Sequence, residues 1–237
     1  MIEALDVFSA AEWEAIRLSL IVAFWCTFTV IPPAIAVAWL LARADFPGKI
    51  LVDALVHLPL VMPPVVTGYL LLILLGRRGP VGGWLEDWFG IVFAFKWTGA
   101  VIASAVMAFP LAVRAVRVAI ETVDPAMERA ARSLGAGRLR TFMSVTLPLA
   151  MPGVIAGAVL AFAKSLGEFG ATITFVSNIP GETQTIPSAI YSAIQTPGGE
   201  EPALRLTLMA VALSVLALIV SEWFVRRLPK PRRGRLD

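Results

Sequence analysis

Long apolar stretches alternate with short polar ones along most of this chain, and five of the apolar stretches are long enough to cross a lipid bilayer. An α-helix rises about 1.5 Å per residue, so about 20 apolar residues cross a hydrocarbon core about 30 Å thick. The predicted membrane-spanning helices cover residues 18–42, 50–75, 98–120, 153–176 and 206–225. We therefore expect an all-α, polytopic membrane protein with a single transmembrane domain over residues 1–237.

Two shorter segments are interpreted differently. Phe89–Phe95 is apolar but too short to cross, and Trp84, Trp88 and Trp97 flank it, which is typical of an interfacial or re-entrant segment. Residues 1–14 are acidic rather than basic, so no cleavable signal peptide is expected there.

Composition supports the membrane assignment. Of the 237 residues, 58% are hydrophobic and 16% are charged, whereas soluble domains average about 25% charged residues. A single Cys and a single His exclude a disulfide scaffold, a thiolate zinc site and a histidine metal cluster, and we expect no cofactor. The net charge is +3, but the basic residues form no patch interleaved with aromatic residues, so no nucleic-acid partner is expected.

The positions of the 20 Lys and Arg residues predict the orientation, because basic residues favour cytoplasmic loops. Fourteen lie near the first and third predicted loops and in the tail from Arg226 to Arg235, five lie on the other side, and Lys164 lies within a span. This distribution places the N-terminus outside and the C-terminus in the cytoplasm.

Prolines and glycines interrupt several predicted spans: Pro32-Pro33, Pro63-Pro64, Pro110, Gly157, Gly167 and Gly170. Such breaks survive in a membrane where neighbouring helices satisfy the freed backbone groups. They indicate either simple kinks for packing or broken helices that line a transport path.

The loop between the third and fourth predicted spans, from Asp124 to Gly153, has a strong local pattern. Asp124 followed by Pro125 is a typical helix start, and Gly135 is a typical stop. Apolar residues recur at helical spacing from the position just before this start: Val123, Met127, Ala130, Ala131 and Leu134. The pattern predicts a short amphipathic helix that either lies on anionic lipid or docks into a groove of another protein.

This segment resembles the EAA loop of the permease subunits of ABC importers. The matching residues are Ala130, Ala131, Gly135, Val145, Leu147 and Pro148, and the glutamate stands one place early as Glu128, with Arg129 in the usual position. In that family the loop forms a coupling helix that sits in a cleft of the ATPase subunit. The resemblance implies a coupling loop at about 121–148 in which Glu128, Ala130, Ala131, Leu134, Gly135, Val145, Leu147 and Pro148 take part.

A narrower resemblance extends over nearly the whole chain. FPGK (46–49), HLPLVMPPVVTGYLLL (57–72), GRRGPVG (76–82) and the stretch 165–200 with SNIPGETQTIPSAIY are similar to the permeases of molybdate importers. Sulfate and thiosulfate permeases share the EAA loop, so sulfate, thiosulfate and tungstate remain alternative substrates. An ion-driven secondary transporter is a more remote alternative. Such a transporter would carry inverted repeats and several intramembrane carboxylates, whereas this sequence has no internal repeat and only Glu168 is a plausible intramembrane carboxylate.

The resemblance implies a type I ABC importer permease fold in the bacterial inner membrane, with a periplasmic N-terminus and a cytoplasmic C-terminus. The implied partners are a second copy of the chain, two ATPase subunits, a periplasmic molybdate-binding protein and membrane lipid. The chain contains no G-x-x-x-x-G-K-[ST] motif, so we expect a non-enzymatic subunit whose energy comes from a separate ATPase.

Polar residues inside the spans are candidates for a pathway or gate. Lys164 and Glu168 lie four residues apart on one helical face, and they form either a self-neutralising structural pair or part of an anion path with the Gly167–Gly170 turn. The hydroxyls of Thr67, Thr172 and Thr174 either donate to an oxyanion or bond to their own backbone.

Overall fold

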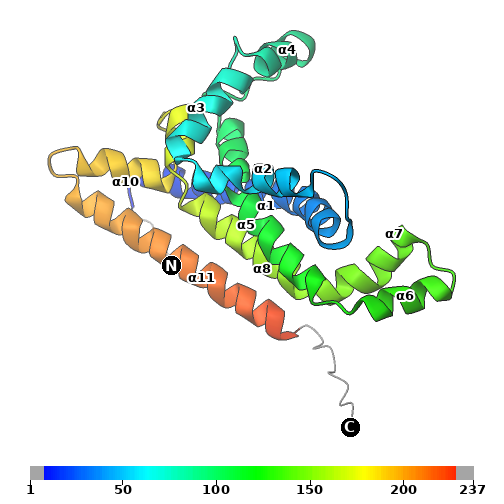
Figure 1. Cartoon of the computed structure of the whole chain (residues 1–237). Helices are drawn as coiled ribbons and strands as arrows, with labels where there is room; N and C mark the ends of the chain where they lie inside the picture. Colours follow the sequence, from blue (N-terminus) through cyan, green and yellow to red (C-terminus); the bar gives the residue numbers. More distant parts are fainter. Residues whose placement is uncertain (1–7, 228–237) are drawn as a thin grey trace.

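The computed structural model describes residues 8–227, and within that range every regular element is a helix (Figure 1). The elements are α1 (Ala10–Arg43), α2 (Lys49–Val61), α3 (Pro64–Leu75), α4 (Pro80–Phe89), α5 (Trp97–Glu121), α6 (Pro125–Ser133), α7 (Arg138–Thr141), the π-helical turn η2 (Phe142–Thr146), α8 (Leu147–Leu166), α9 (Gly170–Val176), α10 (Ile186–Ile194) and α11 (Glu200–Arg227). The all-α prediction is thereby confirmed.

Four segments of the described chain are long and apolar enough to cross a membrane: α1, α5, Arg138–Leu166 and the helix from Glu200. The bent pair α2–α3 makes a fifth if it is counted as one span. This count agrees with the polytopic architecture that the apolar pattern predicts.

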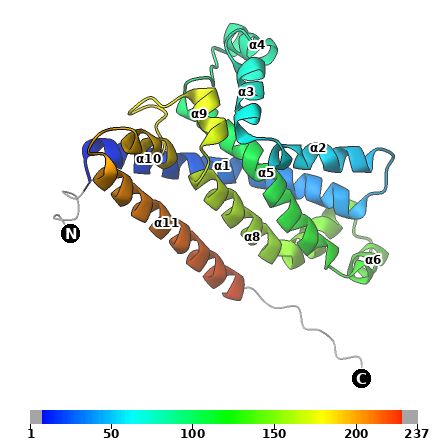
Figure 2. The ribbon, with the colours of Figure 1, turned by 60° about the vertical axis from the view of Figure 1, so that its left-hand side comes forward.

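The core of the molecule is the contact between α1, α5 and α8 (Figures 1 and 2). Small residues permit this close packing: Ala34, Ala38 and Ala112 are fully buried. A Cβ atom added at Gly157 of α8 would lie 3.2 Å from the Ala112 carbonyl oxygen of α5. Close approach through small residues is the usual way for helices to associate in a membrane, where apolar burial between helices gains little, so Gly157 serves packing.

Two groups of helices lie outside this core. The pair α3–α4 projects away from it, and α11 runs along its other side (Figure 2). The start of α11 is fastened to α1, because Arg205 Nε donates to Glu12 Oε1 at 3.1 Å. Further along, α11 exposes Leu208, Val211 and Leu218, which fits a surface that faces lipid.

The second predicted span is not one straight helix. The helix axis bends by 111° between α2 and α3, around Met62 and Pro63. The sequence explains the break, because a residue before proline is driven out of the helical region and Met62 has φ −70° and ψ 146°. Pro64 then occupies the first turn of α3, where its missing N–H is not needed.

The fourth predicted span, 153–176, also differs in shape. Helix α8 begins earlier, at Leu147, and ends at Leu166, and α9 starts after a break at Gly167–Phe169. By contrast, Pro32, Pro33 and Pro110 lie inside the continuous helices α1 and α5.

The first span starts earlier than the apolar pattern predicts. α1 begins at Ala10, eight residues before the predicted start at 18, because Ser9 and Glu12 form a capping box ahead of the apolar run. The segment 90–96 that contains most of the predicted interfacial stretch has no helix. The basic tail from Arg226 to Arg235 lies almost entirely outside the described residues.

Candidate functional site

Helix α6 starts and stops where the local sequence predicts. The Asp124 carboxylate accepts from the Ala126 amide at 2.8 Å, and Pro125 is the first helical residue. After the helix, Gly135 has φ +87° and its amide donates to the Arg132 carbonyl at 3.0 Å, while the Ala136 amide donates to Ala131 at 3.1 Å. These two bonds form a Schellman motif, whose left-handed position favours glycine.

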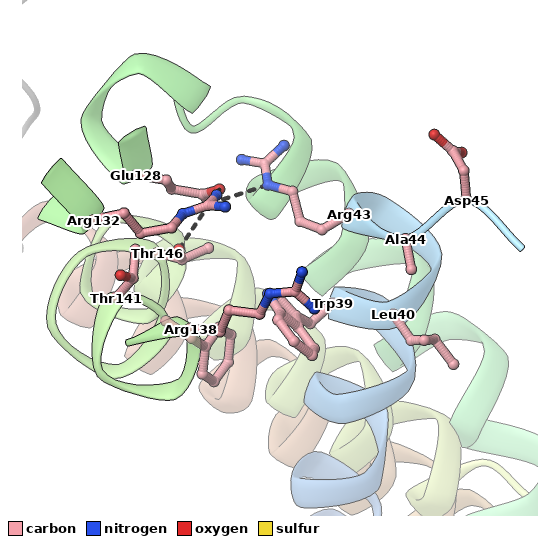
Figure 3. Close-up of a pocket in the computed structure, with 11 residues that line it drawn as sticks. Trp39, Leu40, Arg43, Ala44, Asp45, Glu128, Arg132, Arg138, Thr141 and Thr146 are labelled. Atoms are coloured by element: carbon pink, nitrogen blue, oxygen red, sulfur yellow. Dashed lines mark hydrogen bonds and ion pairs between the residues drawn. The ribbon is translucent and has the colours of Figure 1, made fainter. Parts of the chain in front are cut away.

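Glu128 anchors α6 to the rest of the molecule. Its side chain is buried, and Oε1 accepts from Arg43 Nε at 3.0 Å and from Thr146 Oγ1 at 2.8 Å (Figure 3). Arg132 Nη2 lies 3.7 Å from Oε2. One carboxylate on α6 therefore joins the end of α1 to the turn η2 that leads into α8.

Arg43 extends this network to α5. Its Nη2 donates to the carbonyl of Ile120, in the last turn of α5, at 2.9 Å and to the carbonyl of Val123, just after that helix, at 2.8 Å. The sequence identified Arg43 only as a charge that predicts orientation and did not identify Thr146. No local pattern reveals them, since Arg43 and Glu128 stand 85 residues apart.

The outer side of the same loop exposes apolar side chains. Leu134 is 89% exposed and Leu139 is 75% exposed, and Met127 and Met143 are also exposed. The predicted stripe is thus divided, because Val123 precedes α6 and is buried against the bundle. Exposed apolar residues at the tip of a projecting loop are typical of a surface that meets another protein.

The remaining residues of the EAA-like pattern lie around this surface. Ala130 is exposed and Ala131 half-buried on α6. Val145 belongs to η2, and Leu147 and Pro148 open α8, where Leu147 is half-buried and Pro148 exposed. The structure thus places the two halves of the pattern on either side of one helical hairpin.

The pair formed by Lys164 and Glu168 lies at the break between α8 and α9. Lys164 Nζ and Glu168 Oε2 are 2.6 Å apart, and the side chains are 28% and 1% exposed. Glu168 Oε1 also accepts from the Ala171 amide at 3.0 Å. The carboxylate therefore satisfies both the nearby ammonium group and one of the free amides at the start of α9.

The three candidate threonines lie close to that break. Thr172 donates to the Phe169 carbonyl at 2.9 Å and Thr174 to Gly170 at 2.8 Å, so both hydroxyls bond to their own backbone. Thr67 on α3 is buried, and its hydroxyl has no partner among the described residues.

Glycines bring α3 and α9 into close contact at the same level. A Cβ at Gly68 would lie 2.5 Å from the Ala171 carbonyl oxygen, and one at Gly170 would lie 2.7 Å from Pro64 Cβ. At Gly167 the nearest atom would be 3.8 Å away, so that residue has room. Two of the predicted breaks, Pro63-Pro64 and Gly167–Gly170, thus meet in space.

A second set of charges fastens α2 to α5. Arg117 donates through Nη1 to Asp53 at 3.0 Å and through Nε to Glu121 at 2.8 Å. His57 Nδ1 lies 2.9 Å from the Asp53 carbonyl. The single histidine is thus hydrogen-bonded within its own helix.

A core of long apolar helices, two broken helices in contact, and a projecting loop with a capped helix define a membrane transport permease. The fold is that of ABC importer permeases. The structure of a bacterial alginate ABC transporter matches with a TM-score of 0.74 at 19% identity, over 94% of this chain and 82% of that one. The MetNI methionine ABC transporter matches with a TM-score of 0.68 at 15% identity, over 93% of this chain and 95% of that one.

The chain belongs to the family described as binding-protein-dependent transport system inner membrane component, whose model matches residues 34–230. It is 61% identical to the molybdenum transport system permease protein ModB of Escherichia coli K12, over 94% of this chain and 97% of that protein. It is 58% identical to ModB of Haemophilus influenzae, over 92% and 96%. The sulfate transport system permease protein CysT of Escherichia coli K12 is 40% identical over 67% of this chain and 57% of that protein.

Proposed function

We propose that this protein is the permease subunit of an ATP-driven importer that carries molybdate across the bacterial inner membrane. The observation that carries the proposal is 61% identity, over nearly the full length of both chains, to a molybdenum transport permease. The match covers 94% of this chain, so it supports the substrate class and not only the fold.

In this proposal α6 is the coupling helix. The exposed apolar residues Met127, on this helix, and Leu134, directly after it, with Ala130 and Ala131 beside them, fit a groove on an ATPase subunit. A displacement of α6 reaches α1 through Arg43 and α8 through Thr146, because Glu128 bonds to both. Gly135 lets the chain turn sharply at the end of the helix.

Energy comes from two copies of a separate ATPase in this proposal. The chain itself has no P-loop motif to hold nucleotide phosphates. A second copy of the permease completes the pathway, since five spans are few to enclose one, and a two-fold dimer is the commonest closed assembly.

The orientation follows the positive-inside rule, with a periplasmic N-terminus and a cytoplasmic C-terminus. The segments 79–97 and 179–202 then face the periplasm, where a molybdate-binding protein would deliver the anion.

The contact between α3 and α9 is the proposed gate region. Both helices begin at a break, so each can swing about it without losing internal hydrogen bonds. Lys164, Gly167, Glu168, Gly170, Thr67, Thr172 and Thr174 lie on or beside these helices. Lys164 supplies a positive potential for a dianion, and Glu168 limits it so that the anion is not trapped.

Sulfate import is the second candidate, because a sulfate permease matches 67% of the chain at 40% identity. The match is lower and covers 57% of that relative, so molybdate is the better-supported substrate.

The decisive experiment is uptake of labelled molybdate into proteoliposomes that contain the permease, the ATPase and the binding protein. We expect ATP-dependent accumulation that excess tungstate reduces and excess sulfate does not. Accumulation of sulfate in preference to molybdate would replace the first candidate with the second. Accumulation driven by an ion gradient without ATP would exclude both.

A further inference from the structure

A polar cavity of about 360 Å³ lies where the end of α1 meets α6, α7 and η2 (Figure 3). Arginines from three of these elements, Arg43, Arg132 and Arg138, reach the space (Figure 3). The exposed apolar residues Met127 and Leu134, which are proposed to contact the ATPase, do not line this cavity.

The charges around this cavity leave two arginines with unused donors. Glu128 Oε1 accepts from Arg43 and Thr146, and Asp45 points away into solvent, where it pairs with Lys49 at 3.3 Å. Among residues 8–227, the Arg132 guanidinium has only the long contact of 3.7 Å to Glu128. Within residues 8–227, no side chain or carbonyl accepts a hydrogen bond from the Arg138 guanidinium.

One wall of the cavity is apolar. The rings of Trp39 and Phe142 pack 5.4 Å apart at an interplanar angle of 56°, and Leu40 is partly exposed beside them. Trp39 and Leu40 lie within the last turn and a half of α1, where its apolar run ends at Arg43, and Phe142 is the first residue of η2. Tryptophan and arginine at the end of a membrane-spanning helix lie at the depth of lipid headgroups.

We propose that this cavity binds the phosphate group of an anionic phospholipid. Arg132 and Arg138 supply charge-assisted hydrogen bonds to the phosphate oxygens, and the Trp39–Phe142 wall contacts the glycerol and the first methylene groups. A free phosphate ion would use the same two arginines. The apolar wall and the position at the end of α1 favour the lipid as the source.

Occupancy has a structural consequence. The lipid would join α1 to both helices of the loop, in addition to the link through Glu128. Lipid composition would then affect how firmly the α6–α7 hairpin is held.

The test uses the purified full-length chain in mild detergent, titrated with phosphatidylglycerol or phosphatidylcholine and observed by native mass spectrometry. The variant is Arg132→Gln with Arg138→Gln, and the matched control is Arg129→Gln with Arg140→Gln, which removes the same charge from the same two helices outside the cavity. We expect the variant to bind phosphatidylglycerol about ten-fold more weakly and the control to bind as the parent does. Phosphatidylcholine binding should be the same in all three proteins.

An equal loss of phosphatidylglycerol binding in variant and control would overturn the proposed site, because binding would then follow net charge alone. No loss in either would also overturn it. A third arm adds inorganic phosphate: if it binds in an arginine-dependent way while phosphatidylglycerol does not, the lipid is wrong as the occupant. A melting temperature equal to that of the parent shows that the variant is folded, since Glu128 keeps Arg43 and Thr146 as partners.

Discussion

Two buried glutamates in this molecule, Glu128 and Glu168, both have partners for their carboxylate groups, but the partners come from different parts of the chain. Glu128 accepts hydrogen bonds from side chains 85 and 18 residues away, on α1 and η2. Glu168 takes its partners from its own neighbourhood, Lys164 and the Ala171 amide. Glu128 therefore joins separate helices, whereas Glu168 pairs with groups on the two sides of the break between α8 and α9.

The comparison predicts different consequences when each carboxylate is lost. Removing one partner of a buried ion pair leaves the other charge uncompensated, and that cost depends on whether the remaining group can reach water. Arg43 is held by two carbonyls at the end of α5, while Lys164 is more exposed and has a flexible stem.

The largest effect is expected for Glu128→Gln. This change removes the charge that pairs with Arg43, and we expect it to lower the free energy of unfolding by about 3 kcal/mol. Because α6 loses its anchor, ATP hydrolysis in the assembled transporter should also become uncoupled from uptake. Thermal unfolding and paired ATPase and transport assays measure the two effects. The idea that Glu128 is an anchor fails if stability and coupling both stay at the parent level.

Glu168→Gln should have a smaller effect, about 2 kcal/mol, because the amide oxygen still accepts from Ala171 and Lys164 can turn toward solvent. Adding Lys164→Met should recover most of that stability, since both charges then disappear together.

Uptake by the double variant separates the two interpretations of this pair. Normal molybdate uptake would make the pair purely structural. Loss of uptake with recovered stability would support the proposed role of Lys164 in the pathway.

Thr146→Val tests whether η2 shares the anchor. The substitution keeps the shape and removes one hydrogen bond to a carboxylate, for a loss of about 1.5 kcal/mol in the free energy of unfolding. Combined with Glu128→Gln, its effect should be much less than additive, since both act on one network. Full additivity would show that the 2.8 Å contact contributes little.

The smallest effect on stability is expected for Gly135→Leu, about 1 kcal/mol, because a side chain at φ +87° is strained although the surrounding space is open. Gly137→Leu is the matched control, since that position also has open space but a φ of −66°. If Gly135 shapes the coupling surface, only the first variant should hydrolyse ATP without transport. Equal uptake in both variants would count against that role.

The same contrast explains how far the sequence predicted the fold and the site. Apolar runs predicted where the helices lie, and Asp124 and Gly135 predicted the ends of α6, because these signals are local. Pro63-Pro64 predicted a break, but the angle of 111° depends on how α3 packs against α9. The pairing of Lys164 with Glu168 was predicted from their spacing of four residues.

The partners of Glu128 were not predictable in this way. Arg43 and Thr146 become its neighbours only when α1, α6 and η2 are brought together, and no periodicity in one chain encodes that contact. The same holds for Glu12 and Arg205, which lie 193 residues apart.

Arg43 also constrains the order in which the chain is assembled. It closes α1, yet its three partners, Ile120, Val123 and Glu128, are made 77, 80 and 85 residues later. At about 5–20 residues per second, that interval lasts roughly 4–17 s. During this time the guanidinium group of Arg43 lies at the membrane surface without the partners that it has in the folded protein.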